Sequence, residues 1–373
     1  MIPFNKPHLT GKEIEYITKA VENGKIAGDG AYTRQCEQLL ERRYGYRKCM
    51  LTSSGTDALE MAAILTGVGE GDEVIMPSFT HASTANAFVM RGAHIVFADS
   101  YADHPCIDVS SIESLVTPRT KVIVAVHYAG IACDMDTIRS IANKHQLLII
   151  EDCSLALDSY YKKRPLGGIG HMAALSFHES ANVQCGEGGM LVINDEQFID
   201  RAEIIWQKGT NLTACMEGKA DRYQWLDIGS SFMPSDIIAA FLLAQLESIN
   251  DIQAAYKERW EAYYHALLPL EKEGILELPK IPKHTTYNWQ KFFIISRNAE
   301  ERQELISALK ARDTHPLLHY QALHNSPFYR QHHDGRELPN ADRFSDKLLR
   351  LPYHLSLTQE EIEKVAAIVR RPL

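Results

Sequence analysis

The chain has 373 residues, of which 45% are hydrophobic and 23% charged, and its 39 Lys+Arg and 48 Asp+Glu give a formal net charge of −9. These values are typical of a globular protein with a large buried core, and they exclude a disordered or fibrous chain. The acidic balance and the lack of a Lys/Arg-rich block argue against nucleic-acid partners. The sequence also has no signal-peptide pattern and no apolar run near the ~20 residues that span a bilayer. We therefore expect a cytoplasmic protein without membrane partners. Seven scattered cysteines without CxxC pairs favour reduced thiols over disulfides or structural zinc.

Helical and strand-like segments alternate along the first half of the chain. Thr10 and Glu13 have the spacing of a capping box, and the apolar residues that follow predict an amphipathic helix that stops at Gly24. Short runs rich in Val and Ile then alternate with helical patterns, at 73–76, 95–98, 121–126, 147–150, 173–177 and 190–193. Because such continuous runs suit strands that are covered on both faces, we expect a mainly parallel sheet flanked by helices.

The second half of the chain begins with a polar stretch at 207–227, which we interpret as a long functional or interface loop. Further helices are expected at 234–246, 252–273, 299–310 and 359–370, with a strand at 291–296. The sequence therefore predicts a large α/β domain over 1–250, which includes the N-terminal helix. A linker helix and a smaller C-terminal α+β domain follow over 251–373.

Three turns of the large domain carry groups that could do chemistry. Gly55 and Thr56 enter a helix, where free amides and the helix dipole suit an anion, although an ordinary N-cap explains the same pattern. Asp152 ends an apolar strand and would project into the crevice of a parallel sheet, unless it caps a helix or forms a salt bridge. The glycine-dense run at 185–189 indicates a backbone pressed against a ligand or a neighbouring strand.

A set of motifs gives these turns a context. In chain order they are SSGT, PSFTxxSTANAF, VHYAG, a strand ending in Glu-Asp, SFHESxN, GEGG, KGTN, DIGSSF, SDxxAA and HYxxLH. Their order and spacing resemble the DegT/StrS family of nucleotide-sugar aminotransferases, over the chain from residue 2 to the C-terminus. Within that family the sequence is most similar to the dTDP-4-oxo-6-deoxyglucose 4-transaminases, which make amino sugars for cell-surface glycans.

The resemblance implies a fold and a set of roles. The fold would be that of aspartate aminotransferase, the type I fold of enzymes that use pyridoxal 5′-phosphate (PLP), in a homodimer with active sites at the subunit interface. By matching motifs, the residues that would hold the cofactor phosphate are Gly55, Thr56 and Ser176, with residues 229–231 of the partner subunit. Asp152 would pair with the pyridine nitrogen and keep it protonated, which makes the ring an electron sink. The residues implied near the nucleotide-sugar pocket are His319, Tyr320 and His324.

The chain departs from the family at the residue on which the family's chemistry depends. The family has a lysine that forms a Schiff base with PLP and moves protons, whereas this chain has Ala181, whose methyl group does neither. The nearby Lys162 and Lys163 fall in a predicted turn and offer no replacement. Two further departures, Leu155 for a glutamine and His81 for an aromatic residue that stacks on the cofactor, favour natural divergence over a single laboratory substitution.

These departures predict a nucleotide-sugar aminotransferase homologue with a degenerate cofactor site. It would bind PLP or pyridoxamine 5′-phosphate (PMP) at most noncovalently, or would bind no cofactor, and would not carry out normal transamination. His178 and His81 are candidate acid/base groups, although we favour the interpretation of both as hydrogen-bonded pocket histidines. The alternatives are an active transaminase with a Lys→Ala change, a PLP-independent enzyme acting on a keto sugar, and a non-catalytic partner of an active paralogue. No histidine cluster has zinc spacing, so we expect no metal.

Overall fold

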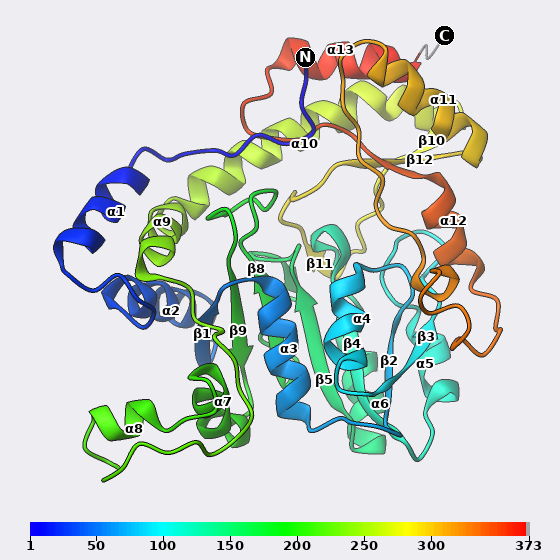
Figure 1. Ribbon diagram of the computed structural model, residues 1–373. Helices are drawn as coiled ribbons and strands as arrows, with labels where there is room; N and C mark the ends of the chain where they lie inside the picture. The colour runs from blue at the N-terminus through cyan, green and yellow to red at the C-terminus, as the bar shows by residue number, and fades with distance from the viewer. Residues whose placement is uncertain (371–373) are drawn as a thin grey trace.

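A computed structural model describes residues 1–370 of the protein. Its centre is a seven-stranded sheet with the order β1-β9-β8-β5-β4-β2-β3 (Figure 1). In chain order its strands are β1 (Lys48–Thr52), β2 (Glu73–Pro77), β3 (His94–Ala98), β4 (Thr120–Val126), β5 (Leu148–Cys153), β8 (Met172–Ser176) and β9 (Gly189–Ile193). Neighbouring strands are parallel except at β9, which runs antiparallel to both β1 and β8. The predicted mainly parallel sheet is confirmed.

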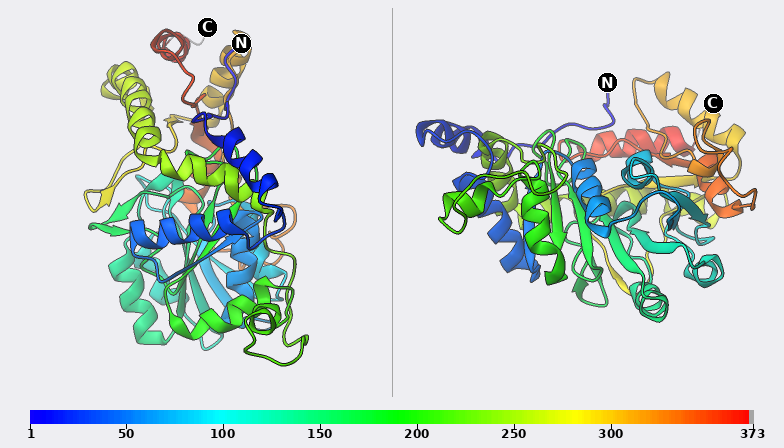
Figure 2. Two further views of the ribbon diagram at one scale, coloured as in Figure 1. Left: turned by 90° about the vertical axis from the view of Figure 1, so that its left-hand side faces the viewer. Right: turned by 60° about the horizontal axis from the view of Figure 1, so that its bottom comes forward.

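Helices flank this sheet on both sides, as the edge-on view at the left of Figure 2 shows. Helix α3 (Gly55–Thr66) packs against β8 and β9, and α6 (Met135–His145) packs against β4 and β5. The other helices that flank the sheet are α2 (Ala31–Tyr44), α4 (Ala82–Val89), α5 (Val109–Leu115) and α7 (Ile199–Trp206). Every residue of β2 and β9 is buried. Because helices cover both faces of these strands, their sequences are continuous apolar runs rather than alternating ones.

The smaller unit follows α9 (Asp236–Glu247), a helix that packs on α1 (Glu13–Glu22) and α2 of the large unit. The long α10 (Ile249–Lys272) leads from it to an antiparallel sheet. That sheet has β10 (Leu276–Glu277), β12 (Phe293–Ser296) and β13 (Leu348–Arg350), and its helices are α11 (Ala299–Lys310), α12 (Pro339–Lys347) and α13 (Gln359–Arg370). A third small sheet joins β11 (Thr285–Thr286), β6 (Tyr160–Tyr161) and β7 (Arg164–Pro165). Among residues 1–370, no helix has the length and apolarity that crossing a membrane requires.

The first residues of the chain pack on the smaller unit, near α13 in Figure 1. The amide of Ile2 donates to the Asp313 carbonyl at 2.7 Å, and the His315 amide donates to the Ile2 carbonyl at 3.1 Å. Two residues later, the Phe4 carbonyl accepts the Tyr353 amide at 3.0 Å. The N-terminal segment therefore crosses from the small unit to α1 on the large one.

Several predicted elements have the observed bounds, and others differ. Helices α11 and α13 coincide with the predicted 299–310 and 359–370. The predicted loop at 207–227 contains a short helix, α8 (Leu212–Met216). Strand β1 was not predicted, because a single five-residue run that opens with Lys48 gives little periodicity, and its partner β9 lies far along the chain.

Candidate active site

A cavity of about 530 Å³ opens at the carboxyl edge of the central sheet. One wall comes from the turns that follow β1, β2, β4, β5 and β8, and the opposite wall comes from residues 290, 317, 319, 320 and 350 of the smaller unit. Ligands of open parallel sheets bind at this edge, so we treat the cavity as the candidate active site. The predicted site residues that line it are Gly55, Thr56, His81, Asp152, Leu155, Ser176, His178, Ala181, His319 and Tyr320.

The turn between β1 and α3 forms an anion seat. The hydroxyl of Ser54 accepts the Asp57 amide at 3.0 Å and so caps the helix. The amides of Gly55 and Thr56 precede that bond, have no acceptor within the helix, and stand at the positive end of its dipole. The cap and the anion site therefore coexist, because the Ser54 side chain serves the first and the two amides remain for the second.

Close packing holds this turn in place. A Cβ added to Gly55 would lie 2.8 Å from the Cβ of Ser176, at the end of β8. A Cβ added to Gly189 would lie 2.2 Å from the Ser54 carbonyl oxygen. A glycine is therefore required at the end of the GEGG motif because β9 contacts the turn there. Of the two explanations for this glycine-dense run, the close approach of neighbouring backbone holds at Gly189, rather than contact with a ligand.

Asp152 faces the cavity with both carboxylate oxygens oriented by hydrogen bonds. Its Oδ2 accepts the Thr84 hydroxyl at 2.7 Å, and its Oδ1 accepts both the amide and the hydroxyl of Ser154, at 3.0 and 2.6 Å. Only 5% of Asp152 is exposed. A carboxylate held this firmly at the carboxyl edge of β5 can pair with a protonated ring nitrogen in the cavity.

The preceding acid, Glu151, points the other way into the core. Its carboxylate accepts the amides of Gly167, Ile169 and Gly170 at 3.0, 2.8 and 2.6 Å, and pairs with Nε2 of His127 at 3.0 Å. Burial alone would raise the pKa of Glu151, but these hydrogen bonds hold it below the ordinary value. Glu151 is therefore structural: it fixes the 167–170 loop and leaves Asp152 as the acid of the site.

The residues at and around position 181 leave an open region in the cavity wall. Ala181 lines the cavity, and its amide donates to the His178 carbonyl at 2.8 Å. Nδ1 of His178 contacts the Ser180 hydroxyl at 3.0 Å, and Nδ1 of His81 contacts the Ser83 hydroxyl at 2.7 Å. Both histidines thus use Nδ1 to hold their own turn, and Nε2 of His178 lies 3.7 Å from a carboxylate oxygen of Glu187.

The smaller unit contributes a positively charged wall. Arg350 is buried, and its guanidinium contacts the His319 ring at 2.8 Å. Burial, and then the charge of Arg350, lower the pKa of His319 far below its ordinary value, so that histidine is neutral. Tyr320 stacks on His319, with ring centroids 4.0 Å apart, and meets the edge of His81 at 5.6 Å.

His324 does not line the cavity, in contrast to its predicted place beside the nucleotide sugar. It is 5% exposed, its Nδ1 contacts the Ser78 hydroxyl at 2.7 Å, and its amide donates to the same oxygen at 3.1 Å. The second histidine of the HYxxLH motif thus ties the loop after β2 to the smaller unit. The geometry gives it a positioning role behind the wall.

Lys291, like Arg350 and Gln290, is a polar residue of this region that the sequence did not single out as functional. It begins an otherwise apolar strand segment, it is only 3% exposed, and its Nζ donates to the carbonyl of Ser180, next to Ala181. Burial and the nearby Arg350 lower the pKa of Lys291 well below its ordinary value. A lysine at the start of an otherwise apolar strand segment could have indicated a functional residue. Its proximity to Ala181, however, depends on a contact between residues 111 positions apart, which the sequence does not reveal.

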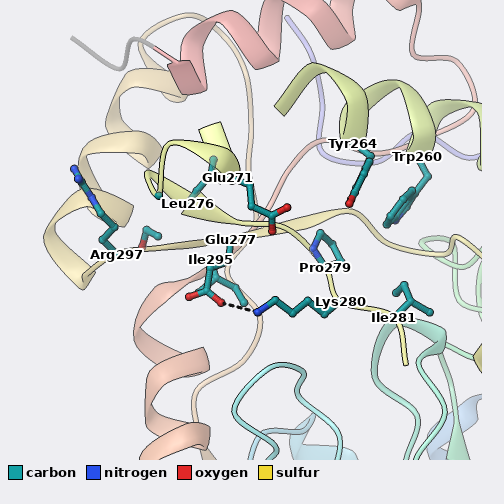
Figure 3. Close-up of a pocket in the computed structure, with 12 residues that line it drawn as sticks. Trp260, Tyr264, Glu271, Leu276, Glu277, Pro279, Lys280, Ile281, Ile295 and Arg297 are labelled. Atoms are coloured by element: carbon teal, nitrogen blue, oxygen red, sulfur yellow. Dashed lines mark ion pairs between the residues drawn. The ribbon is translucent and has the colours of Figure 1, made fainter. Parts of the chain in front are cut away.

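Two further groups of polar residues within residues 1–370 have their charges satisfied by the fold itself. A cavity of about 820 Å³ between α10 and the β10–β12 edge carries Glu271, Glu277, Lys280 and Arg297 (Figure 3). These charges have partners within the fold, such as the Glu277–Lys280 ion pair drawn in Figure 3. The buried His127, Glu151 and Cys153 bring three possible metal ligands together, but the Glu151 oxygens are already saturated by hydrogen bonds.

The fold and the cavity define a class of protein: a type I PLP aminotransferase fold, with its site at the carboxyl edge of the large-domain sheet. The chain belongs to the DegT/DnrJ/EryC1/StrS aminotransferase family, which matches residues 7–370. It is 32% identical over 364 residues to GDP-perosamine synthase of Escherichia coli O157:H7, covering 97% of this chain and 95% of that protein.

Solved structures agree with this membership. The aminotransferase TlmJ from Streptoalloteichus hindustanus has a TM-score of 0.92 at 26% identity, with 100% of this chain and 98% of that chain covered. Spr1654 from Streptococcus pneumoniae, assigned as a sugar aminotransferase and solved in its PMP form, has a TM-score of 0.91 at 25% identity, with both chains fully covered, 100% each.

The residues of the cavity fit a PLP-type cofactor in their noncovalent contacts only. The anion seat and Asp152 supply partners for a phosphate and for a ring nitrogen. The Tyr128 hydroxyl and Nε2 of Gln290 line the same cavity, are buried, and have no hydrogen-bond partner among the described residues. Such groups call for a polar ligand. The covalent attachment does not fit at position 181, because Ala181 has no amine.

Proposed function

We propose that this protein is a nucleotide-sugar aminotransferase homologue of deoxyamino-sugar biosynthesis that holds PMP or PLP without a bond to residue 181. It would accept a dTDP-linked keto-deoxyhexose of a cell-surface glycan pathway in the cytoplasm, and it would lack normal transamination. The observation that carries the proposal is the retained pairing of an anion seat with Asp152, across a cavity in which position 181 carries a methyl group.

The roles of the chain's own residues follow from their contacts. The amides of Gly55 and Thr56 and the Ser176 hydroxyl would bind the phosphate, and Asp152 would hold a proton on the ring nitrogen through its oriented carboxylate. The cofactor, when bound, supplies the electron-withdrawing ring of this chemistry. The neutral His319 and the Arg350 guanidinium would face the substrate end of the cavity, where a cation suits the diphosphate of a nucleotide sugar.

PMP is the decisive probe because it has no carbonyl and can bind only through noncovalent contacts. Calorimetric titration should give saturable binding of PMP, with one site per chain, to the wild-type protein. With dTDP-4-oxo-6-deoxyglucose and glutamate, the wild type should form no amino sugar, whereas Ala181→Lys should form it. Absence of PMP binding would refute the seat, and amino-sugar formation by the wild type at the rate of Ala181→Lys would refute the loss of normal transamination.

We also propose that the protein forms a homodimer. The loop at 207–227 exposes Met216, Tyr223 and Trp225, the last with 80% of its surface accessible, and residues 229–231 beside it are exposed as well. Contiguous exposed apolar side chains of this kind mark protein interfaces. Sedimentation should give a dimer for the wild type and a shift toward monomer for Trp225→Ser; a monomeric wild type would contradict the proposal.

A further inference from the structure

The strongest unassigned feature of the molecule is the amine of Lys291 behind position 181. Its Nζ donates to the carbonyl of Ser180, so the amine lies one peptide unit from Ala181. The neighbours of Lys291 on both sides, Gln290 along the chain and Ser180 across the hydrogen bond, line the cavity. The amine therefore stands directly behind the part of the wall that the missing side chain leaves open.

The backbone carbonyl of Lys291 accepts two hydrogen bonds, whereas its amine, within residues 1–370, donates only one. The carbonyl of Lys291 accepts Nε1 of Trp260 at 3.2 Å and the Tyr287 hydroxyl at 3.0 Å. Among the residues that the structure describes, no carboxylate forms an ion pair with Nζ, which has a single neutral acceptor. A lysine has a flexible four-carbon stem, and turning its amine toward the cavity requires exchange of that one bond.

The surroundings of Lys291 also favour a reactive amine. An amine attacks a carbonyl only in its neutral form, and lysines become neutral when they are desolvated or lie beside another cation. Both conditions hold here, because Lys291 is 3% exposed and the buried Arg350 lowers its pKa further. A lysine whose function was only to carry charge would be expected to have a carboxylate partner in such a place.

We propose that Lys291 is the amine nucleophile of this cavity and captures the aldehyde of PLP in place of the lysine that position 181 lacks. The Nζ lone pair attacks the aldehyde carbon and forms a C–N bond, while the carbonyl π electrons move to oxygen. Protons pass from nitrogen to that oxygen, water leaves, and a C=N bond remains, so amine and aldehyde give imine and water without an oxidant. This inference rests on the proposed function, because the cofactor must first occupy the seat, and it replaces purely noncovalent binding for PLP but not for PMP.

The test is to trap the bond and to map it. Wild-type protein is incubated with PLP, reduced with borohydride, digested, and analysed by peptide mass spectrometry. We expect the reduced pyridoxyl-phosphate adduct predominantly on Lys291, with at least tenfold less on exposed lysines such as Lys310. Lys291→Met and Lys291→Arg should lose that adduct, while Lys310→Met, the matched surface control, should keep it.

The outcomes separate this inference from the proposed function. If PMP binds and the wild-type adduct lies on other lysines or on none, Lys291 is not the nucleophile and the inference is wrong. If PMP does not bind, the seat itself is wrong, and an absent Lys291 adduct then refutes both proposals. Because the wild-type map alone decides the inference, failure of a Lys291 variant to fold leaves the result intact. Retention of PMP affinity within about threefold by Lys291→Met would show that the lost adduct reflects the amine rather than a damaged cavity.

Discussion

The anion seat makes a quantitative prediction for Gly55→Ala. The added methyl carbon would lie 2.8 Å from the Ser176 Cβ, with the Ser176 hydroxyl at 3.2 Å and the Leu175 carbonyl at 3.3 Å, so the α3 N-terminus must move away from β8. Overpacking of this kind costs about 1–3 kcal/mol, whereas replacing glycine by alanine in a helix gains about 1 kcal/mol. The free energy of unfolding should therefore fall by no more than about 2 kcal/mol.

Binding of PMP should suffer more than stability does. The displaced amides lengthen their hydrogen bonds to the phosphate, and a hydrogen bond to a charged group contributes about 1.5–3 kcal/mol. The dissociation constant of PMP should thus rise about 10- to 150-fold, since 1.4 kcal/mol corresponds to a factor of ten. Isothermal titration calorimetry measures it, with urea unfolding of the same samples.

The matched control is Gly69→Ala, whose new Cβ would meet nothing closer than the Arg91 carbonyl at 3.8 Å. It should leave PMP affinity unchanged. If folded Gly55→Ala binds PMP within twofold of both the wild type and this control, the turn before α3 is not the phosphate seat.

Three further predictions concern the acids and the positively charged wall. Glu151→Gln should lower the free energy of unfolding by about 3–5 kcal/mol, measured by urea denaturation, because it leaves buried donors unpaired; a loss below 1 kcal/mol would contradict the structural role. The native contacts lower the pKa of Glu151, so the ionised carboxylate stabilises the fold fully above the unfolded-state pKa near 4.5. That contribution is lost as pH falls through the lower native pKa. In Glu151→Gln the free energy of unfolding should therefore depend less on pH in the acid range. Asp152→Asn should weaken PMP binding about tenfold and shift the ultraviolet absorbance of the bound ring, and an unchanged spectrum would argue against a ring-nitrogen contact. Arg350→Met should raise the pKa of His319 toward its ordinary value, because one of the charges that lower it is removed, and histidine proton NMR would show an unchanged titration if that explanation were wrong.

The sequence predicted local features well because they depend on local patterns. The bounds of α11 and α13 follow from helical periodicity between a capping residue and a break, as Asn298 shows by accepting the Glu301 amide. The turn before α3 and Asp152 were recognised from a strand followed by small or acidic residues, and the fold brings both to one cavity.

The features that the sequence did not predict depend on contacts between distant segments. Antiparallel pairing of β1 with β9 brings residues 48–52 against 189–193, and no periodicity within five residues reveals it. His324 belongs to a site motif, yet its partner Ser78 lies 246 positions away and draws it out of the cavity. The sequence did not indicate Lys291 because it lies far along the chain from position 181. The fold brings this lysine of the smaller unit to the Ser180 carbonyl, next to Ala181.

The wall of the cavity also affects how the protein matures. Its lining extends along the chain from Phe4 to Arg350, so it is incomplete until nearly the whole polypeptide has left the ribosome. The central sheet is complete by residue 193, and the early-made layer can therefore fold before a ligand has anywhere to bind. A ligand that binds only the finished cavity stabilises the joined state of both units, so cofactor supply would act on the last step of assembly and on the lifetime of the mature protein.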